Sequence, residues 1–329
     1  HIFSMKIATC LVNPRACYET ELIFKETNVA KNIAVIGAGP AGLSFAIYAA
    51  NRGHHVTIFE AAAQIGGQFN IAKTIPGKEE FYETLRYFKR QIELQPRIKL
   101  LLNRKATFEQ LVSAEFDDIV VATGVTPRQL NIPGIDHPKV LSYLDVLRER
   151  KPVGQRVAII GAGGIGFDTA ELLSHGAESG SVNPEKFYDE WGIDTDYENV
   201  GGLKPAHVEQ PQREIYLLQR KPASVGSSLG KTTGWIHRTG LKHRHVKMIA
   251  GASYEKIDDQ GLHIVVNDKP ALLEVDQIII CAGQESHTAM FDELKAAGKS
   301  VHLIGGAKEA GELDAKRAIR QGAELAAVI

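Results

Sequence analysis

Residues 32–60 read NIAVIGAGPAGLSFAIYAANRGHHVTIFE, and this stretch decides the fold. An apolar run precedes Gly37, a helix-like segment follows Gly42, and a second apolar run ends at Glu60. The glycines permit a tight turn and let the backbone approach a pyrophosphate. The helix after them directs free N–H groups and its positive dipole end at phosphate charge. The stretch therefore predicts a strand, a phosphate-binding turn, a helix and a second strand.

The same unit occurs a second time. VAII at 157–160 leads into GAGGIG at 161–166, and a helix-like stretch covers 168–173. Further β-branched runs lie at 118–122, 214–218 and 277–281. Another helix-like stretch covers 79–94. Continuous apolar runs suit parallel strands that helices bury on both faces. The alternation predicts an α/β fold with two Rossmann-like dinucleotide-binding domains, the second inserted in the first.

Length and composition exclude several classes of function. The 329 residues suggest about two domains, and 44% hydrophobic with 23% charged residues is typical of a soluble protein. A net charge of −1 argues against nucleic acid or an anionic membrane as partner. No apolar run approaches the roughly 20 residues that span a bilayer, and no signal peptide is evident.

The three cysteines limit the redox chemistry. Cys10, Cys17 and Cys281 are too few for a disulfide framework, which predicts a reducing cytoplasm. No cysteine pair lies near Gly67, so a thiol relay is excluded, and Cys281 at the end of a buried strand is expected to be inert. The chain opens HIFSMK without an initiator Met, which suggests a piece of a longer protein.

The first glycine-rich turn has further partners along the chain. Glu60 ends the next strand, where a carboxylate accepts hydrogen bonds from ribose hydroxyls. A Gly-Gly turn at 66–67 and an Ala-Thr-Gly element at 122–124 follow in an order that resembles the FAD domain of two-dinucleotide flavoproteins; a plain strand end is the alternative for the latter. The residues predicted to hold FAD are Gly37, Gly39, Pro40, Ala41, Gly42, Glu60, Gly67, Gln68, Ala122, Thr123 and Gly124.

The second turn carries a different charge pattern. The strand at 214–218 ends in Gln219, Arg220 and Lys221, where an NAD site would place a carboxylate. Arg and Lys pair with a 2′-phosphate that a carboxylate would repel, so these residues favour NADPH over NADH. The alternative is that Arg220 and Lys221 are solvated surface cations with no role in nucleotide binding. The predicted NADPH site comprises Gly161, Gly163, Gly164, Ile165, Gly166, Arg220 and Lys221.

Two other segments invite interpretation. Residues 175–212, rich in Gly, Pro and acidic residues, form a long insertion that is expected to cover a cofactor or meet a partner. Trp235 and Ile236 suit either the nicotinamide side of the site or core packing. No side chain is predicted to be catalytic, because hydride transfer needs no acid or base.

The whole chain resembles the NADPH-dependent 2,4-dienoyl-CoA reductases of bacteria, within a group that includes trimethylamine dehydrogenase. The resemblance is carried by CLVNPRAC at 10–17, GGQFNIAK at 66–73, IPGKEEFYETLRYFKR at 75–90, HPKVLSYLDVLR at 137–148, IIGAGGIGFDTA at 159–170, LGKTTGWIHR at 229–238 and ICAGQE at 280–285. It completes the predicted cofactor-binding set with Gly283, Gly305, Gly306 and Leu313. A helix near Leu313 is expected to direct N–H groups at the flavin.

The resemblance also implies partners outside this chain. In that family an N-terminal barrel binds FMN and the dienoyl-CoA thioester, and a four-cysteine [4Fe–4S] cluster links it to an FAD/NADPH half. Cys10 matches the last cluster ligand, but one cysteine cannot hold a cluster. The chain departs from the family in lacking the barrel and a complete cluster site. It also has Gly305-Gly306 where many flavoproteins have a Gly-Asp pair.

The resulting domain prediction has four segments: 1–28, a remnant of the iron–sulfur segment; 29–152, the first part of the FAD domain; 153–280, the NADPH domain; and 281–329, the return of the FAD domain. The predicted function is hydride transfer from NADPH to FAD, with electrons passed on. Two alternatives stay open: a structural half that binds ADP or FAD without redox activity, and a free-standing NADPH–ferredoxin reductase.

Overall fold

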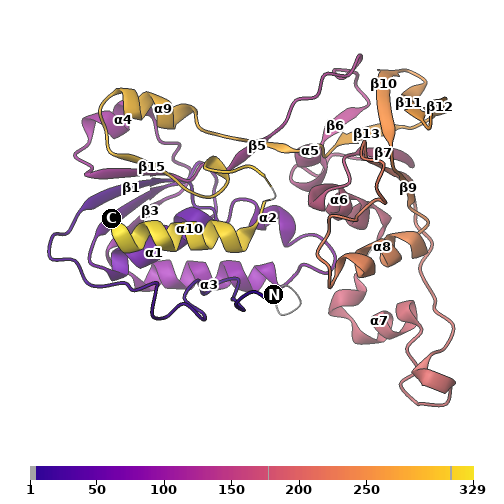
Figure 1. The fold of residues 1–329 in the computed structure, drawn as a ribbon, viewed down its shortest axis with the longest axis horizontal. Coiled ribbons are helices and arrows are strands. Elements are labelled where there is room, and N and C mark those ends of the chain that lie inside the picture. The colour runs from indigo at the N-terminus through magenta and orange to yellow at the C-terminus, as the bar shows by residue number, and fades with distance from the viewer. Residues whose placement is uncertain (1–4, 177, 312) are drawn as a thin grey trace. The chain divides into compact units, whose positions relative to one another are not determined.

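The computed structural model describes residues 5–176, 178–311 and 313–329. They form two compact units that interleave along the chain (Figure 1). Unit 1 contains the chain up to Asn70, Phe81–Thr126 and Gln284–Ile329, and unit 2 contains Ile71–Glu80 and Pro127–Gly283.

Unit 1 is built on a parallel five-stranded sheet in the order β15-β4-β1-β2-β3. The strands are β1 (Asn32–Ile36), β2 (His55–Phe59), β3 (Ile98–Leu101), β4 (Asp118–Val121) and β15 (Val301–Leu303). Their alternate residues point to opposite faces, and both faces are buried. Helices α1 (Pro40–Asn51), α3 (Phe81–Leu94) and α10 (Ala315–Val328) contribute to the core on one face, and α4 (Phe108–Ser113) and α9 (Ala289–Ala296) to the core on the other.

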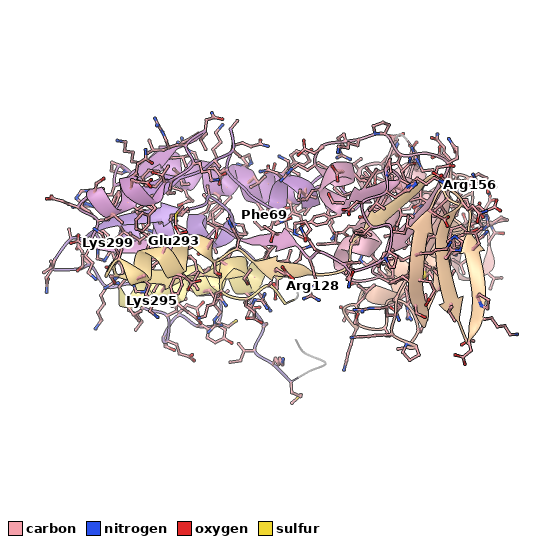
Figure 2. All side chains as sticks on the ribbon, turned by 90° about the horizontal axis from the view of Figure 1, so that it is seen from above. Phe69, Arg128, Arg156, Glu293, Lys295 and Lys299 are labelled. Carbon is pink, nitrogen blue, oxygen red and sulfur yellow. The ribbon has the colours of Figure 1, made fainter. Side chains whose placement is uncertain are left out.

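Shorter elements complete this unit and the crossings to the next. Helix α2 (Phe69–Ala72) begins with Phe69 (Figure 2). The Phe69 ring stacks on that of Phe81, with the ring centroids 4.8 Å apart. Strands β5 (Val125–Pro127) and β14 (Gln284–Ser286) pair with each other, and the 3₁₀ turn η4 (Gly305–Ala307) follows β15.

Unit 2 repeats the plan with a second parallel sheet in the order β6-β13-β7-β8-β9. Its strands are β6 (Val140–Ser142), β7 (Arg156–Ile160), β8 (Glu214–Leu218), β9 (Lys247–Ile249) and β13 (Gln277–Ile280). One face packs with α5 (Tyr143–Leu147), α6 (Gly164–Ser174) and α8 (Gly234–His243). The other packs with an antiparallel sheet of β10 (Ala252–Asp258), β11 (Gly261–Val266) and β12 (Lys269–Leu273).

The two ends of the second sheet differ in chemistry. Arg156 starts β7 at the amino edge of the sheet (Figure 2). Its guanidinium pairs with the Asp276 carboxylate, with nitrogen and oxygen 3.2 Å apart. The glycine-rich loop follows the carboxyl end of the same strand. Between α6 and β8, the long insertion forms η2 (Gly180–Val182), α7 (Pro184–Trp191) and η3 (Val200–Gly202).

The predicted fold class is confirmed, because two parallel sheets each carry a strand–glycine loop–helix unit. The predicted domain boundary near Val153 is too late. Strand β6 pairs in parallel with β13, so the chain enters unit 2 at Pro127, and 71–80 also belong there. The apolar run at 140–142 that marks this boundary has only three residues, which are too few for a clear strand pattern.

Candidate dinucleotide-binding sites

The first glycine-rich loop joins β1 to α1. Gly37 has φ of 106°, a conformation that side chains rarely adopt, and a Cβ there would lie 2.5 Å from the carbonyl oxygen of Ala122. A Cβ on Gly42 would overlap the carbonyl oxygen of Gly37. Glycine is therefore required at both positions for the turn and for the close packing of helix on strand.

The amino end of α1 is open to a ligand. Gly39 is the N-cap residue and supplies no side-chain cap, and Pro40 occupies the first turn. A Cβ on Gly39 would meet no atom within 4 Å. Free first-turn N–H groups beside open space are what an anion-binding helix terminus needs, so this end fits a pyrophosphate.

The other residues predicted for the first site gather around this loop. The amide of Gly66 donates to the Ala38 carbonyl at 2.8 Å, and a Cβ on Gly67 would lie 3.2 Å from the Cα of Gly39. Gln68 is half-buried in the same turn. Pairs from distant segments also meet here: Gly305 lies against Ala41, Gly306 against Gly124, and the Thr123 hydroxyl donates to the His287 carbonyl at 2.6 Å.

The helix predicted from Leu313 begins later, at Ala315. Asp314 is its N-cap, and its carboxylate accepts from the amides of Lys316 and Arg317. The apolar pattern alone places the start of this helix two residues too early, because Asp314 caps it. Leu313 is 39% exposed before the helix, and two of the N–H groups expected to face a flavin bond to the cap instead.

The second glycine-rich loop repeats the geometry in unit 2. Gly161 has φ of 107°, and a Cβ there would lie 2.7 Å from the carbonyl oxygen of Cys281. A Cβ on Gly166 would overlap the Gly161 carbonyl. Gly163 is an N-cap without a side-chain cap, and neither it nor Gly164 would meet an atom within 4 Å if it carried a Cβ.

The flanks of the second loop are basic. Arg220 and Lys221 are exposed directly after β8, and Ile165 is half-buried in the first turn of α6. Gly283 lies just beyond the strand that packs on the loop, and a Cβ there would lie 3.3 Å from the Arg128 guanidinium carbon. Every residue predicted for the second site thus lies at or beside the carboxyl edge of the second sheet.

An ion pair that the sequence did not reveal lies beside the second loop. The Lys78 ammonium bonds both carboxylate oxygens of Asp168, at 2.6 and 2.7 Å, two residues after Gly166. Burial and the nearby Lys78 charge lower the pKa of His237. The pair fixes segment 71–80 to the start of α6, and no local spacing signals a contact across so many residues.

Trp235 and Ile236 lie at the surface of unit 2, whereas Cys281 is buried in it. Trp235 is 55% exposed on α8 and Ile236 is 38% exposed, so the core-packing alternative is wrong for both. Cys281 is buried against the Thr169 hydroxyl, and burial raises the pKa of its thiol to about 12. A thiol held in this protonated form is a poor nucleophile.

The described part of the chain does not contain a metal centre. No group of three or more His, Cys, Asp or Glu side chains could hold an ion there, so Cys10 has no companion ligands among these residues. The described residues on their own therefore do not fit a four-cysteine cluster.

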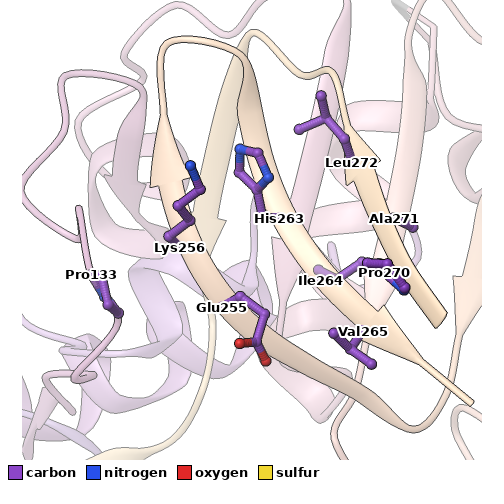
Figure 3. Close-up of a pocket in the computed structure, with 9 residues that line it drawn as sticks. All are labelled: Pro133, Glu255, Lys256, His263, Ile264, Val265, Pro270, Ala271 and Leu272. Carbon is purple, nitrogen blue, oxygen red and sulfur yellow. The ribbon is translucent and has the colours of Figure 1, made fainter. Parts of the chain in front are cut away.

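A surface hollow lies on the antiparallel sheet of unit 2. It has a volume of about 620 Å³ and opens on the outer side of β10–β12. Figure 3 shows side chains of all three strands along it, with Pro133 at one edge. It is lined by Pro133, Glu255, Lys256, His263, Ile264, Val265, Pro270, Ala271 and Leu272. No residue predicted to bind a cofactor is among them.

A family model described as pyridine nucleotide-disulphide oxidoreductase matches residues 31–307. The chain belongs to this family. Membership makes it part of a flavin-dependent oxidoreductase and agrees with two dinucleotide sites, one for FAD and one for NAD(P). Within the described residues, no helix has the length and apolar character needed to cross a membrane.

Relatives of the chain are longer than it is. It is 33% identical over 318 residues to a metal reductase from Desulforamulus reducens, covering 93% of this chain and 45% of the relative. It is 27% identical to a cinnamate reductase from Clostridium sporogenes, covering 92% and 40%. The chain thus spans less than half the length of these curated relatives.

Solved structures share the fold. A 2-naphthoyl-CoA reductase in complex with 2-naphthoyl-CoA matches with a TM-score of 0.83 and 26% identity, covering all of this chain and 44% of that one. A histamine dehydrogenase from Rhizobium sp. 4-9 matches with a TM-score of 0.76 at 19% identity, covering 98% and 48%.

Proposed function

We propose that the chain is an NADPH-oxidising module, with FAD bound at the first glycine-rich loop and NADPH at the second. The observation that carries the proposal is the pair of uncapped helix N-termini, each opening beside glycines whose missing Cβ atoms leave room for a pyrophosphate. When bound, the two cofactors supply hydride chemistry of their own.

The chain's own residues bind and orient in this proposal. Glu60 would fix the ribose of one nucleotide, and Arg220 and Lys221 would pair with the 2′-phosphate of the other. The Lys78–Asp168 ion pair would hold segment 71–80 in place beside the second loop. No proton has to be taken up or given by a side chain.

For a longer protein, the proposal extends to reduction of a conjugated acyl-CoA, with 2,4-dienoyl-CoA as the substrate that the sequence resemblance implies. The likeness to a structure titled 2-naphthoyl-CoA reductase supports an acyl-CoA thioester. FMN and a [4Fe–4S] cluster with Cys10 as one ligand belong to this extension, and both need residues that this chain does not supply. A cytoplasmic location likewise stays a prediction.

The relatives favour a division of labour. Their names include a metal reductase and a cinnamate reductase, matched over 93% and 92% of this chain, and a bilirubin reductase, matched over 53% of it. If this segment is a common electron-input module, then relatives that share it can reduce different acceptors. We therefore assign the choice of acceptor to the part of the relatives that this chain does not cover.

The proposal is tested by the visible spectrum of the purified chain under anaerobic conditions, followed by titration with NADPH and, separately, with NADH. A flavin band that bleaches at stoichiometric NADPH and only at higher NADH is expected. A colourless chain, or a flavin that neither nucleotide bleaches, would instead identify a structural half without redox activity.

A further inference from the structure

The insertion between α6 and β8 is ordered without a hydrophobic core of its own. Among the described residues, no hydrophobic side chain between Leu173 and Ile215 is buried. Helix α7, within the insertion, buries none of its eight residues. Ordering a backbone costs conformational entropy, which folded segments recover mainly by burying apolar surface. An ordered segment of this length is therefore expected to gain burial from a further surface.

Large apolar side chains of the insertion face solvent. In the loop that follows α7, Tyr197 is 85% exposed and Val200 is 98% exposed. Figure 1 shows α7 and this loop extending from unit 2 on the side opposite β10–β12. The exposed apolar residues of the insertion are Val182, Phe187, Tyr188, Tyr197, Val200 and Leu203. Such a concentration in one segment is typical of a protein–protein contact site.

The loop after α7 is held in place by polar contacts. The buried carboxylate of Asp194 accepts from the amides of Asp196 and Asn199, at 3.1 and 2.7 Å. The amide of Asp194 in turn donates to the Gly202 carbonyl at 2.9 Å. Tyr197 is fixed between these contacts with φ of 59°. A loop that is already ordered loses little entropy when it binds, which favours its use as a contact.

The insertion and the rest of the chain carry opposite net charge. Residues 175–212 hold eight acidic and two basic side chains, whereas the rest of the chain holds 31 acidic and 36 basic ones. Asp196 and Glu198 flank Tyr197, and neither has an ion-pair partner among the residues that the structure describes. An apolar centre with an acidic rim is complementary to a basic surface. The rest of a second copy of this chain has the required sign of charge.

We propose that the insertion is the docking element of a homodimer, in which residues 182–203 of each copy lie on the basic remainder of the other copy. A twofold axis makes the two contacts equivalent, so each pair of chains uses the insertion surface twice. Contact between the two insertions themselves is disfavoured, because both are acidic. The inference concerns assembly and is independent of which nucleotide the second loop binds.

The test is sedimentation velocity of the purified chain over a series of concentrations, at low and at high salt. A monomer–dimer equilibrium is expected, with weaker association at high salt because the opposite charges are screened. Tyr197→Asn combined with Val200→Ser removes the two most exposed apolar side chains of the insertion, and asparagine tolerates the backbone conformation of Tyr197. This variant should weaken the dimer on the order of tenfold or more.

Val29→Ser combined with Val328→Ser is the matched control, because both valines are exposed in unit 1. It should leave the dissociation constant unchanged. Asp196→Asn combined with Glu198→Gln is a second loop variant, which keeps the apolar side chains and the size of the loop. It should weaken the dimer at low salt and have little effect at high salt.

Two results would overturn the proposal. A chain that stays monomeric at every concentration would assign the surface of the insertion to a different protein. A dimer that the loop variants leave as tight as the control does would have its contact elsewhere on the chain. An unchanged temperature of thermal unfolding shows that the loop variants are folded, so that a loss of association is a loss of contact.

Discussion

A single glycine decides whether the second loop can close. Gly166→Ala places a methyl group on the carbonyl oxygen of Gly161, which is backbone and cannot move aside cheaply. We expect the variant to lose nucleotide binding at the second loop and about 2 kcal/mol or more of stability in unit 2, as overpacked sites do. Thermal unfolding and nucleotide titration measure the two effects.

Gly163→Ala is the matched control, since its Cβ would meet no atom within 4 Å. Its unfolding temperature should stay close to that of the unaltered chain, while nucleotide binding weakens because the methyl group enters the ligand's space. Equal destabilisation by both variants would show that the loop does not have the close packing described.

The cysteines should differ in reactivity by position. Cys281 is buried with a raised thiol pKa, whereas Cys17 is exposed. Alkylation of the native chain with iodoacetamide at pH 8, followed by mass spectrometry, should modify Cys17 within minutes and leave Cys281 unmodified until denaturant is added. Rapid native labelling of Cys281 would contradict the inert role assigned to it.

At the scale of elements, helix α10 packs closely against α1 and holds it in place. Gly322 lets the two helices approach so closely that a Cβ there would overlap the carbonyl oxygen of Ala41, and the Ser44 hydroxyl donates to the Ile319 carbonyl at 2.8 Å. Gly322→Val should destabilise unit 1 by about 2–3 kcal/mol and weaken FAD retention, because α1 carries the first loop.

Flavin fluorescence released during a thermal ramp measures this effect. Gly311→Ala is the comparison, as its Cβ would meet no atom within 4 Å. If Gly322→Val released FAD at the same temperature as the unaltered chain, the close packing of α1 on α10 would not be needed to retain FAD.

Much of this architecture follows from local pattern. The strands that contain 118–121, 156–160, 214–218 and 277–280 were predicted within a residue or two, because each is a buried apolar run next to a turn. The gathering of Gly305 and Gly306 at the first loop was predicted only from family resemblance. The Lys78–Asp168 pair and the unit of β6 were missed, since both depend on contacts between distant segments that no local spacing encodes.

For the whole molecule, acid should weaken unit 2 before carboxylates are protonated. His175 is buried, its Nε2 lies 2.9 Å from an Arg244 nitrogen, and its Nδ1 lies 2.9 Å from the Glu171 carbonyl. This arrangement suits a neutral ring that accepts from Arg244. Burial and the Arg244 charge lower the pKa of His175 to about 4.

As the pH falls, His175 is therefore protonated in the unfolded chain before it is protonated in the folded chain. Stability is complete above about pH 6.5 and falls as the pH approaches 4, by up to about 3 kcal/mol from this group. Urea unfolding at pH 7 and pH 5 checks the loss. His175→Gln, which keeps an acceptor for Arg244 without titrating, should flatten the slope; an identical slope in both proteins would assign the effect elsewhere.

The interleaving of the units also sets an order of events on the ribosome. Unit 1 starts first, but β15 and α10, which complete its sheet and cover α1, come from the segment after Gly283. Unit 2 has all of its strands once Gly283 has emerged. Unit 2 can thus finish folding while unit 1 waits, with the apolar side of α1 unprotected, until α10 has been translated.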